Sequence, residues 1–349
     1  MKNIFEFSRE KLEEDLLSKG ISKYRSQQIF DWIYKKNVLD VEKMQNISKI
    51  DIEIIKNEYS FEKMKVVDVK ESSDRTKKFL FELNDGNYIE TVLMNFSYGK
   101  SICISTQVGC DMGCSFCASG KDKKVRDLTV AEMVLQVVQV KDSLVEGENL
   151  TNIVIMGIGE PFDNYINLID FIKIVNDNKG INIGARHITV STCGLVPQIL
   201  EFANLPLQVN LAISLHFAND EKRSKYMKIN KAYNLEKLFN ALEIYYNKTN
   251  RRITFEYLLI KEVNDSLTDA KQLVSLIKGL NAYVNLIPYN DTQMFSRSPK
   301  EAQNRFYDYL MKNRINVTLR REQGLDISAA CGQLRIKKMR DDYGKRVDN

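Results

Sequence analysis

A serial alternation of strand-like and helix-like segments constrains the fold of this chain more than any other sequence feature. Short apolar runs rich in β-branched residues recur at residues 101–106, 152–156, 187–191, 209–214, 253–260 and 283–287. Amphipathic stretches of helical length separate them, at residues 129–138, 166–178, 195–202, 235–247 and 267–278. Six strand–helix units in series predict an α/β domain whose parallel sheet is covered by helices, either curled as an incomplete barrel or left open.

The segments that flank this alternation have other periods. Residues 1–60 carry three short apolar stripes at helical spacing, with Leu17 and Ile50 among them, which predicts a small N-terminal helical domain. Residues 77–94 alternate as strands do around an Asn-Asp-Gly turn, which predicts a β-hairpin extension. A last helix and strand are expected at 299–312 and 317–320. We divide the chain into residues 1–60, a linker and hairpin at 61–95, the α/β core at 96–330 and a C-terminal tail at 331–349.

The composition limits the class of protein. The chain has 349 residues, 44% apolar and 28% charged, which is typical of a folded globular protein. No run approaches the roughly 18 consecutive apolar residues that a membrane-spanning helix requires, and residues 1–11 lack the apolar centre of an export signal. We therefore expect a cytoplasmic protein without a membrane partner. The net charge of +5 is compatible with a nucleic-acid partner but too small to demonstrate one.

Three of the six cysteines lie within eight residues. Cys110, Cys114 and Cys117 form a Cys-x3-Cys-x2-Cys pattern directly after the first strand of the alternation, so we expect them at the C-terminal mouth of the sheet. Two histidines are too few for a multi-histidine metal site, and no further residue is spaced as a fourth zinc ligand. A [4Fe–4S] cluster with one iron open to a small molecule therefore fits better than a three-cysteine zinc site or a chance group of buried thiols.

Polar residues follow several other predicted strands. The second strand ends in Gly157-Ile158-Gly159-Glu160-Pro161, which fails as a dinucleotide fingerprint because Phe162 replaces the third glycine. Glycines allow a ligand to approach the backbone and Glu160 can pair with an ammonium group, although a plain strand-to-helix turn has the same residues. Hydroxyl, imidazole and amide groups that can bind a ligand, or simply satisfy their own loops, follow three more strands, at Ser191, Ser214-Leu215-His216 and Asn290.

Basic residues cluster near the expected mouth of the sheet. Such runs are usually solvated faces, and they are also the electrostatic footprint of RNA binding. The clusters contain Lys121, Lys123, Lys124 and Arg126, then Lys222-Arg223-Ser224-Lys225, and in the tail region Arg320, Arg321, Arg335, Lys337, Lys338 and Arg340.

The cysteine pattern on the first loop of a serial strand–helix domain resembles that of the radical S-adenosylmethionine (SAM) enzymes. This resemblance implies a partial (βα)6 barrel and a [4Fe–4S] cluster bound by Cys110, Cys114 and Cys117, whose open iron chelates SAM. The Gly157 to Pro161 segment is similar to the GGEP motif of these enzymes, which contacts the methionine part of SAM. The implied SAM-binding residues are Gly159, Glu160, Ser191, Ser214, Leu215, His216 and Asn290, although Asp291 stands where relatives often have proline.

Nearly the whole chain resembles the RlmN family of RNA adenine C2-methyltransferases. The resemblance is carried by Glu90-Thr91-Val92 and by residues 103–110, 114–118, 157–165, 214–216 and 330–334. It implies formation of 2-methyladenosine in 23S rRNA, at the peptidyl-transferase centre, and in tRNA, at the adenosine 3′ of the anticodon. A low-potential electron donor such as flavodoxin or ferredoxin is implied as a partner. Tyr24, Arg25, Gln28 and Trp32 resemble the accessory domain, which assists RNA binding in the family.

The same resemblance implies roles for three residues in the reaction. Cys331 takes a methyl group from one SAM, and a second SAM supplies the radical that drives this carbon onto the electron-poor C2 of adenine. Glu90 is the implied proton acceptor, and Cys103 releases the product through a transient disulfide with Cys331. Cys193 has no such role, and we interpret it as structural. The alternatives are a Cfr-type adenine C8-methyltransferase and, from another class, a non-catalytic zinc protein that binds RNA.

Overall fold

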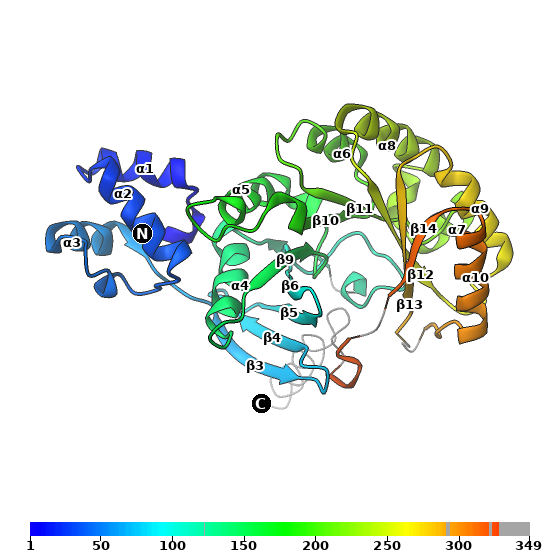
Figure 1. The fold of residues 1–349 in the computed structure, drawn as a ribbon, viewed down its shortest axis with the longest axis horizontal. Helices are drawn as coiled ribbons and strands as arrows, with labels where there is room; N and C mark the ends of the chain where they lie inside the picture. Colours follow the sequence, from blue (N-terminus) through cyan, green and yellow to red (C-terminus); the bar gives the residue numbers. More distant parts are fainter. Residues whose placement is uncertain (122, 291–293, 321–322, 328–349) are drawn as a thin grey trace.

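The computed structural model describes residues 1–121, 123–290, 294–320 and 323–327. Its centre is a ten-stranded sheet of order β14-β13-β12-β11-β10-β9-β6-β5-β4-β3 (Figure 1). The strands from β6 to β14 pair in parallel and confirm the predicted α/β alternation, whereas β3, β4 and β5 are antiparallel. The ten strands are β3 (Lys65–Glu71), β4 (Lys77–Glu82), β5 (Tyr88–Phe96), β6 (Gly99–Cys103), β9 (Leu150–Ile155), β10 (Ile188–Thr192), β11 (Asn210–Ser214), β12 (Ile253–Leu259), β13 (Ala282–Pro288) and β14 (Asn316–Leu319).

Helices cover the outer face of the parallel strands (Figure 1). They are α4 (Val130–Asp142), α5 (Tyr165–Asn176), α6 (Val196–Phe202), α7 (Asp220–Tyr226), α8 (Leu235–Thr249), α9 (Leu267–Ile277) and α10 (Lys300–Lys312). The expected capping box begins α4, since Thr129 and Glu132 exchange hydrogen bonds between side chain and backbone. Short α7 was not expected from the sequence. No helix among the described residues is long and apolar enough to cross a membrane.

The N-terminal residues form the expected small helical unit, with α1 (Arg9–Ser18), α2 (Lys23–Phe30), a π-helical turn (Asp31–Lys35) and α3 (Lys49–Glu58). It packs beside α4 and α5 (Figure 1), and Arg9 pairs with Asp177 at 2.8 Å. Leu17 and Ile50, expected within apolar stripes, are 46% and 75% exposed. The unit is so small that one buried row per helix fills its interior, and these two side chains lie outside that row. The two-stranded pair β1 (Lys2–Asn3) and β2 (Tyr59–Ser60) joins its ends.

The hairpin is part of the main sheet instead of a separate extension. Strand β5 pairs antiparallel with β6, with Val92 opposite Cys103, and β3 adds a strand that was not expected. The opposite edge of the sheet also reaches β5: the Arg320 guanidinium lies 3.7 Å from Met94 Sδ, and Gln323 donates to the Asn95 carbonyl oxygen at 2.9 Å. The sheet is therefore curled as an incomplete barrel, and Arg320 and Gln323 bring its two edges into contact.

Candidate functional site

The three predicted cluster ligands lie on one loop between β7 (Gln107–Val108) and β8 (Arg126–Asp127), which pair antiparallel and close the loop at its base. Gly109 has φ +78°, and a Cβ there would lie 2.1 Å from the Lys123 carbonyl oxygen, so only glycine fits this turn. The Lys124 amide donates to Asp111 at 2.9 Å across the loop. The Gly109 turn, the β7–β8 pairing and the Lys124–Asp111 hydrogen bond together hold Cys110, Cys114 and Cys117 at the mouth of the barrel.

The charges of the three thiols interact, which indicates that they lie close together. Burial raises the pKa of Cys110 to about 12, and the charge of Cys117 raises it further. Burial and the charges of Cys117 and Cys110 likewise raise the pKa of Cys114. Within the described ranges, no three His, Cys, Asp or Glu side chains are arranged to hold a metal ion. The donor set is nevertheless sulfur alone, and cysteine thiolates are the ligands of iron–sulfur clusters, so its chemistry fits such a cluster.

Aromatic and backbone contacts hold this loop against two strand ends and α7. The Phe116 ring meets the His216 ring edge-on, with centroids 5.0 Å apart, and the Phe116 carbonyl oxygen accepts from the Tyr289 hydroxyl at 2.9 Å. The Ser115 amide donates to the carbonyl oxygen of Tyr226, at the end of α7, at 3.0 Å. The cysteine loop is therefore packed against the ends of β11 and β13, where other predicted site residues lie.

The predicted ligand-binding residues lie at the C-terminal ends of their strands. The hydroxyls of Ser191 on β10 and Ser214 on β11 are 3.2 Å apart, and Asn290 follows β13 by two residues. Leu215 is fully buried. His216 has φ +57°, and its Nδ1 accepts from the Leu258 amide at 3.3 Å, so Nε2 carries the ring proton. Burial lowers the pKa of His216 to about 3, which leaves the imidazole neutral and able to donate one hydrogen bond.

Glu160 is buried beside the cysteine loop. Its carboxylate accepts from the Phe162 amide at 3.0 Å and from the Cys193 amide at 2.8 Å. Burial raises the pKa of Glu160, and these two amides oppose the rise. The side chains of Thr192 and Cys193 also hydrogen-bond the Glu160 carboxylate. Gly159 has φ +109°, and a Cβ there would clash with the side chains of Gln107 and Thr106. Packing within the protein therefore requires glycine at this position, whether or not a ligand is bound.

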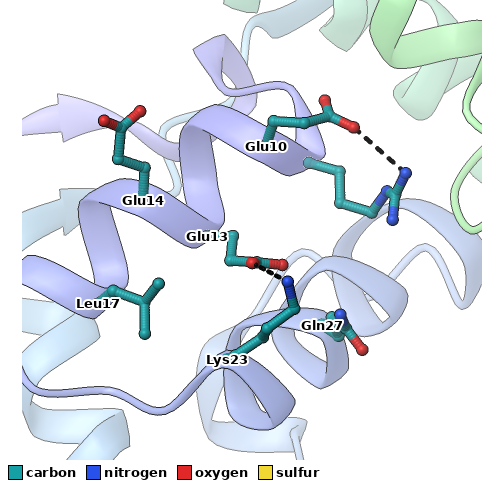
Figure 2. Close-up of a pocket in the computed structure, with 7 residues that line it drawn as sticks. Glu10, Glu13, Glu14, Leu17, Lys23 and Gln27 are labelled. Atoms are coloured by element: carbon teal, nitrogen blue, oxygen red, sulfur yellow. Dashed lines mark hydrogen bonds and ion pairs between the residues drawn. The ribbon is translucent and has the colours of Figure 1, made fainter.

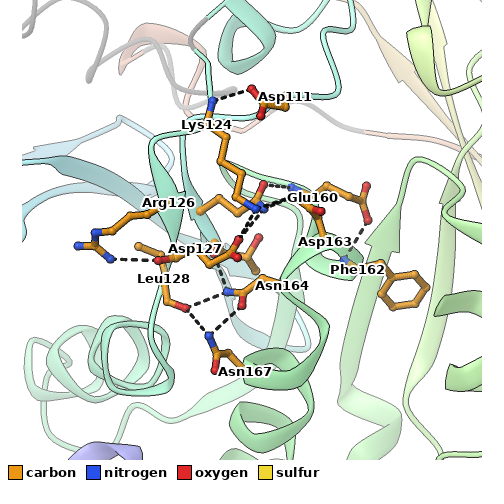
Figure 3. A network of polar contacts seen from close by, with 12 residues as sticks. Asp111, Lys124, Arg126, Asp127, Leu128, Glu160, Phe162, Asp163, Asn164 and Asn167 are labelled. Carbon is orange, nitrogen blue, oxygen red and sulfur yellow. Dashed lines mark hydrogen bonds and ion pairs between the residues drawn. The ribbon is translucent and has the colours of Figure 1, made fainter.

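A polar network joins the cysteine loop to the turn that contains Glu160 (Figure 3). Gln107 accepts from the Glu160 amide at 2.9 Å and donates to Asp127 and Asp163 at 2.8 and 2.9 Å. The Lys124 ammonium pairs with the same two carboxylates. Lys124 belongs to the predicted basic surface, but its positive charge is already neutralised by these two carboxylates.

Two further members of the predicted basic clusters are also engaged inside the protein. Arg126 pairs with Asp85 at 2.6 Å and with Glu132 at 2.8 Å. Arg223 is fully buried, so its placement on an RNA-facing surface was wrong. The residue belongs to α7, and its side chain turns inward toward the Cys193 carbonyl oxygen. Arg321 and the basic residues beyond position 327 lie outside the described residues.

Glu90 and Cys103 form a second part of the site on neighbouring strands. The Glu90 carboxylate is 5% exposed and lies 3.3 Å from the fully buried Lys78 ammonium of β4. Burial raises the pKa of the Cys103 thiol to about 11, and the charge of Arg320 opposes the rise. Sequence reasoning missed Lys78, although a lysine within the Phe79-Leu80-Phe81 strand was an available signal.

The segment before Cys331 is anchored near this second part. The Gly324 amide donates to Asp74 at 2.8 Å, and Asp326 accepts from the Ser72 hydroxyl at 2.5 Å and from the Ser73 amide at 3.1 Å. Residues 72–74 connect β3 and β4. Cys331 itself lies outside the described residues, and the cysteines among the described residues are all free thiols.

A separate hollow of about 290 Å³ lies in the N-terminal helical unit (Figure 2). The positively charged side chains that line it form ion pairs within the protein: Lys23 pairs with Glu13 at 2.7 Å and Arg9 with Glu10 at 3.2 Å. None of the predicted site residues lines it. The candidate site is therefore the mouth of the barrel.

Known proteins are similar to this chain over almost its full length. Residues 104–274 match the model of the radical SAM superfamily, and residues 2–51 match that of the ribosomal RNA large subunit methyltransferase N-terminal domain. Two relatives are described as probable dual-specificity RNA methyltransferase RlmN. The one from Spiroplasma citri is 54% identical and covers 97% of this chain and 98% of its own length. The one from Streptococcus pyogenes is 50% identical and covers 98% of both.

A solved structure has the same fold. The crystal structure of a radical SAM methyltransferase from Sphaerobacter thermophilus superimposes with a TM-score of 0.91 and 42% sequence identity. The match covers 95% of this chain and 99% of the other. It confirms the predicted radical SAM architecture. With the cysteine loop at the barrel mouth and relatives of this identity over the full length, the chain belongs to the RlmN family of radical SAM RNA methyltransferases.

Proposed function

We propose that this enzyme forms 2-methyladenosine in 23S rRNA, at the peptidyl-transferase centre, and in tRNA, at the adenosine 3′ of the anticodon. The relatives' description as dual-specificity RNA methyltransferases supports two RNA substrates. Cys110, Cys114 and Cys117 would bind one [4Fe–4S] cluster, which a donor such as flavodoxin or ferredoxin would reduce. When bound, the cluster and SAM supply the one-electron chemistry that an electron-poor ring carbon requires.

The strand-end residues would hold SAM against the cysteine loop. The Glu160 carboxylate would accept from the ammonium of the methionine part, and the paired hydroxyls of Ser191 and Ser214 would accept or donate to its polar groups. His216 would donate from Nε2, since Nδ1 is already used by Leu258. Gly159, Leu215 and Asn290 complete the proposed set.

One observation carries the proposed roles of the two remote cysteines. Arg320 and Gln323 contact β5, Gly324 and Asp326 bond the turn between β3 and β4, and position 327 is four residues before Cys331. These contacts support the delivery of an S-methyl group on Cys331 to the part of the site that contains Glu90 and Cys103. Glu90 would take the C2 proton, with Lys78 offsetting the cost of its buried charge. The Cys103 thiolate would then attack Cys331 sulfur, so that an S–S bond forms as the S–C bond breaks. The released carbon would take one proton to complete the methyl group, and the electron left over from radical addition would pass to a one-electron acceptor.

Residues 1–60 would assist RNA binding, before the linker and hairpin of 61–95, the core of 96–330 and the tail of 331–349. An exposed aromatic and cationic surface supports this role. Tyr24 is 66% exposed, and the Lys36 ammonium lies 3.5 Å from the centre of the Trp32 ring. Lysine and arginine bind phosphates, and exposed aromatic rings stack on unpaired bases.

A Cys331→Ala variant tests the proposed intermediate. It is expected to lose RNA methylation while it keeps its iron content and its ability to cleave SAM reductively, because the cluster ligands are elsewhere. Iron, SAM cleavage and RNA product are measured on the same preparation. Unchanged RNA methylation in this variant would rule out the proposed methyl carrier.

Isotope labelling tests which carbon is methylated. RNA that carries C2-deuterated adenosine is methylated and the product nucleoside is weighed by mass spectrometry. Loss of the deuterium is expected for methylation at C2. A methylated product that retains the label would favour the C8 chemistry of Cfr-type enzymes instead.

A further inference from the structure

Arg223 on α7 is a fully buried cation at the centre of the site region. Its Nη2 donates to the Cys193 carbonyl oxygen at 2.6 Å, its Nη1 to Asn230 Oδ1 at 2.7 Å and its Nε to the Leu215 carbonyl oxygen at 3.3 Å. These three acceptors are all neutral. The hydrogen bonds satisfy donors of the guanidinium, and its positive charge still needs a negative partner.

The carboxylates of the described residues do not supply that partner directly. None of them forms an ion pair with Arg223. Asp220 is near enough for its charge to act on Arg223, but its Oδ1 accepts hydrogen bonds from Asn230 Nδ2 and from the Leu235 amide instead. Burial lowers the pKa of Arg223, and the charges of Cys193, Cys114 and Asp220 oppose this. Burying a charge without a direct ion pair is costly, so a further nearby anion would stabilise Arg223.

The cysteine loop lies beside this cation. The Ser115 amide is bonded to Tyr226, three residues after Arg223 on the same helix. Cys114 and Cys117 pack against one apolar cluster together with Cys193, Phe217 and Met227. Arg223 also bonds the backbone of Cys193, whose amide binds Glu160. The guanidinium therefore bonds the segments that follow β10 and β11, and the helix that carries it is bonded to the cysteine loop.

We propose that Arg223 is the buried counter-charge of the cluster and raises its reduction potential. The inference rests on the proposed cluster. A [4Fe–4S] cluster held by three thiolates is an anion, and its reduction adds one electron from the low-potential donor without any proton. A fixed cation in surroundings of low dielectric stabilises the added charge. Arg223 is thus a positioning and electrostatic residue that touches neither RNA nor the transferred carbon.

The test is a redox titration of the full-length, iron-reconstituted protein in the absence of SAM and RNA. The reduced cluster is followed by electron paramagnetic resonance. Arg223→Gln removes the charge and keeps a hydrogen-bonding side chain, so its midpoint potential is expected to move to more negative values. Lys225→Gln is the matched control, because it removes the same charge from an exposed position on the same helix and is expected to leave the potential unchanged.

Arg223→Lys separates charge from hydrogen bonding. It keeps the cation, so its potential is expected to stay close to that of the unmodified enzyme. An unshifted Gln variant, or a Lys variant shifted as far as Gln, overturns the inference. If the Gln variant takes up no iron, the Lys variant must restore iron uptake, and failure to do so also overturns it. Absence of iron from the unmodified enzyme would instead overturn the cluster, and the inference with it.

Discussion

The cysteine loop and the Glu90–Cys103 pair are the two parts of the proposed site, and they are built in different ways. The three cysteines come from eight consecutive residues, and aromatic and apolar side chains such as Phe116 and Tyr289 pack around them. Glu90 and Cys103 come from neighbouring strands, their environment contains Lys78 and Arg320, and Gln323, which follows the far edge of the sheet, bonds Asn95 of the same β5 strand.

This difference determines how each part responds to change. The loop contains all three proposed cluster ligands. Loss of a ligand is therefore expected to lower the iron content strongly, whereas loss of one supporting contact is expected to lower it little. The proposed activity of Glu90 and Cys103 is expected to depend on neighbouring charges and on the hydrogen bonds of Asp326, which lies more than 200 positions further along the chain. Its function is therefore sensitive to residues that never contact substrate.

The largest effect is expected on the loop itself. Cys114→Ala removes one of three proposed ligands, so iron content should fall sharply and RNA methylation should become undetectable. Cys193→Ala is the matched control, because it removes a buried thiol from the same apolar cluster and is expected to keep its iron. Iron analysis and absorption near 400 nm make the comparison. Equal iron in both variants would show that Cys114 is not a ligand.

On the other side, Glu90→Gln is expected to lower RNA methylation by about 10²–10⁴-fold, the usual contribution of a general base. Iron content should not change, because Glu90 belongs to the other part of the site. Glu82→Gln on neighbouring β4 removes a carboxylate paired only with surface Lys65 and should leave methylation intact. Single-turnover assays measure both. A Glu90 variant with normal rates would remove this residue from the mechanism.

The release step should depend steeply on pH. Because burial raises the pKa of Cys103 to about 11, the protonated thiol dominates at neutral pH. The thiolate fraction, and with it the rate of release of methylated RNA, should rise about tenfold for each pH unit below that value. Rapid quenching of a preformed protein–RNA adduct at several pH values measures this. A flat profile would mean that the thiolate forms by another route.

The tether of the tail should have a smaller, several-fold effect. Asp326→Ala removes the acceptor of Ser72 and Ser73, so the segment before Cys331 is held less often against the β3–β4 turn. Methylation of Cys331 and then of RNA should slow, while iron content stays constant. Asp308→Ala on exposed α10 is the control. A normal rate of RNA methylation would show that the anchor does not guide the tail.

The smallest effect is expected for a supporting contact of the loop. Tyr289→Phe removes the hydroxyl that donates to the Phe116 carbonyl oxygen, which should cost about 1 kcal/mol in free energy of unfolding. Iron content should be close to normal. Tyr98→Phe at a 64% exposed position provides the reference in denaturant titrations. A large loss of iron would mean that the loop is less self-sufficient than its packing indicates.

Sequence reasoning was most successful where neighbouring residues carry the signal. The alternation predicted the parallel strands, and because carboxyl ends of parallel strands meet at one edge, it also predicted that Ser191 and Ser214 would lie together. It failed for Arg223, since a run of basic residues does not reveal which one turns inward. The buried partner of Glu90 was also missed, because strand pairing brings Lys78 beside it.

The amino-acid sequence alone determined the family and the order of strands and helices, and it predicted the sulfur ligands, since these depend on local spacing and periodicity. Only the tertiary structure decided which charges are buried and which distant segments meet. The cost of burying Lys78 and Arg223 depends on what the closed sheet places around them, and no local pattern contains that information. The contacts of Arg320 and Gln323 with β5 likewise follow from the curl of the sheet.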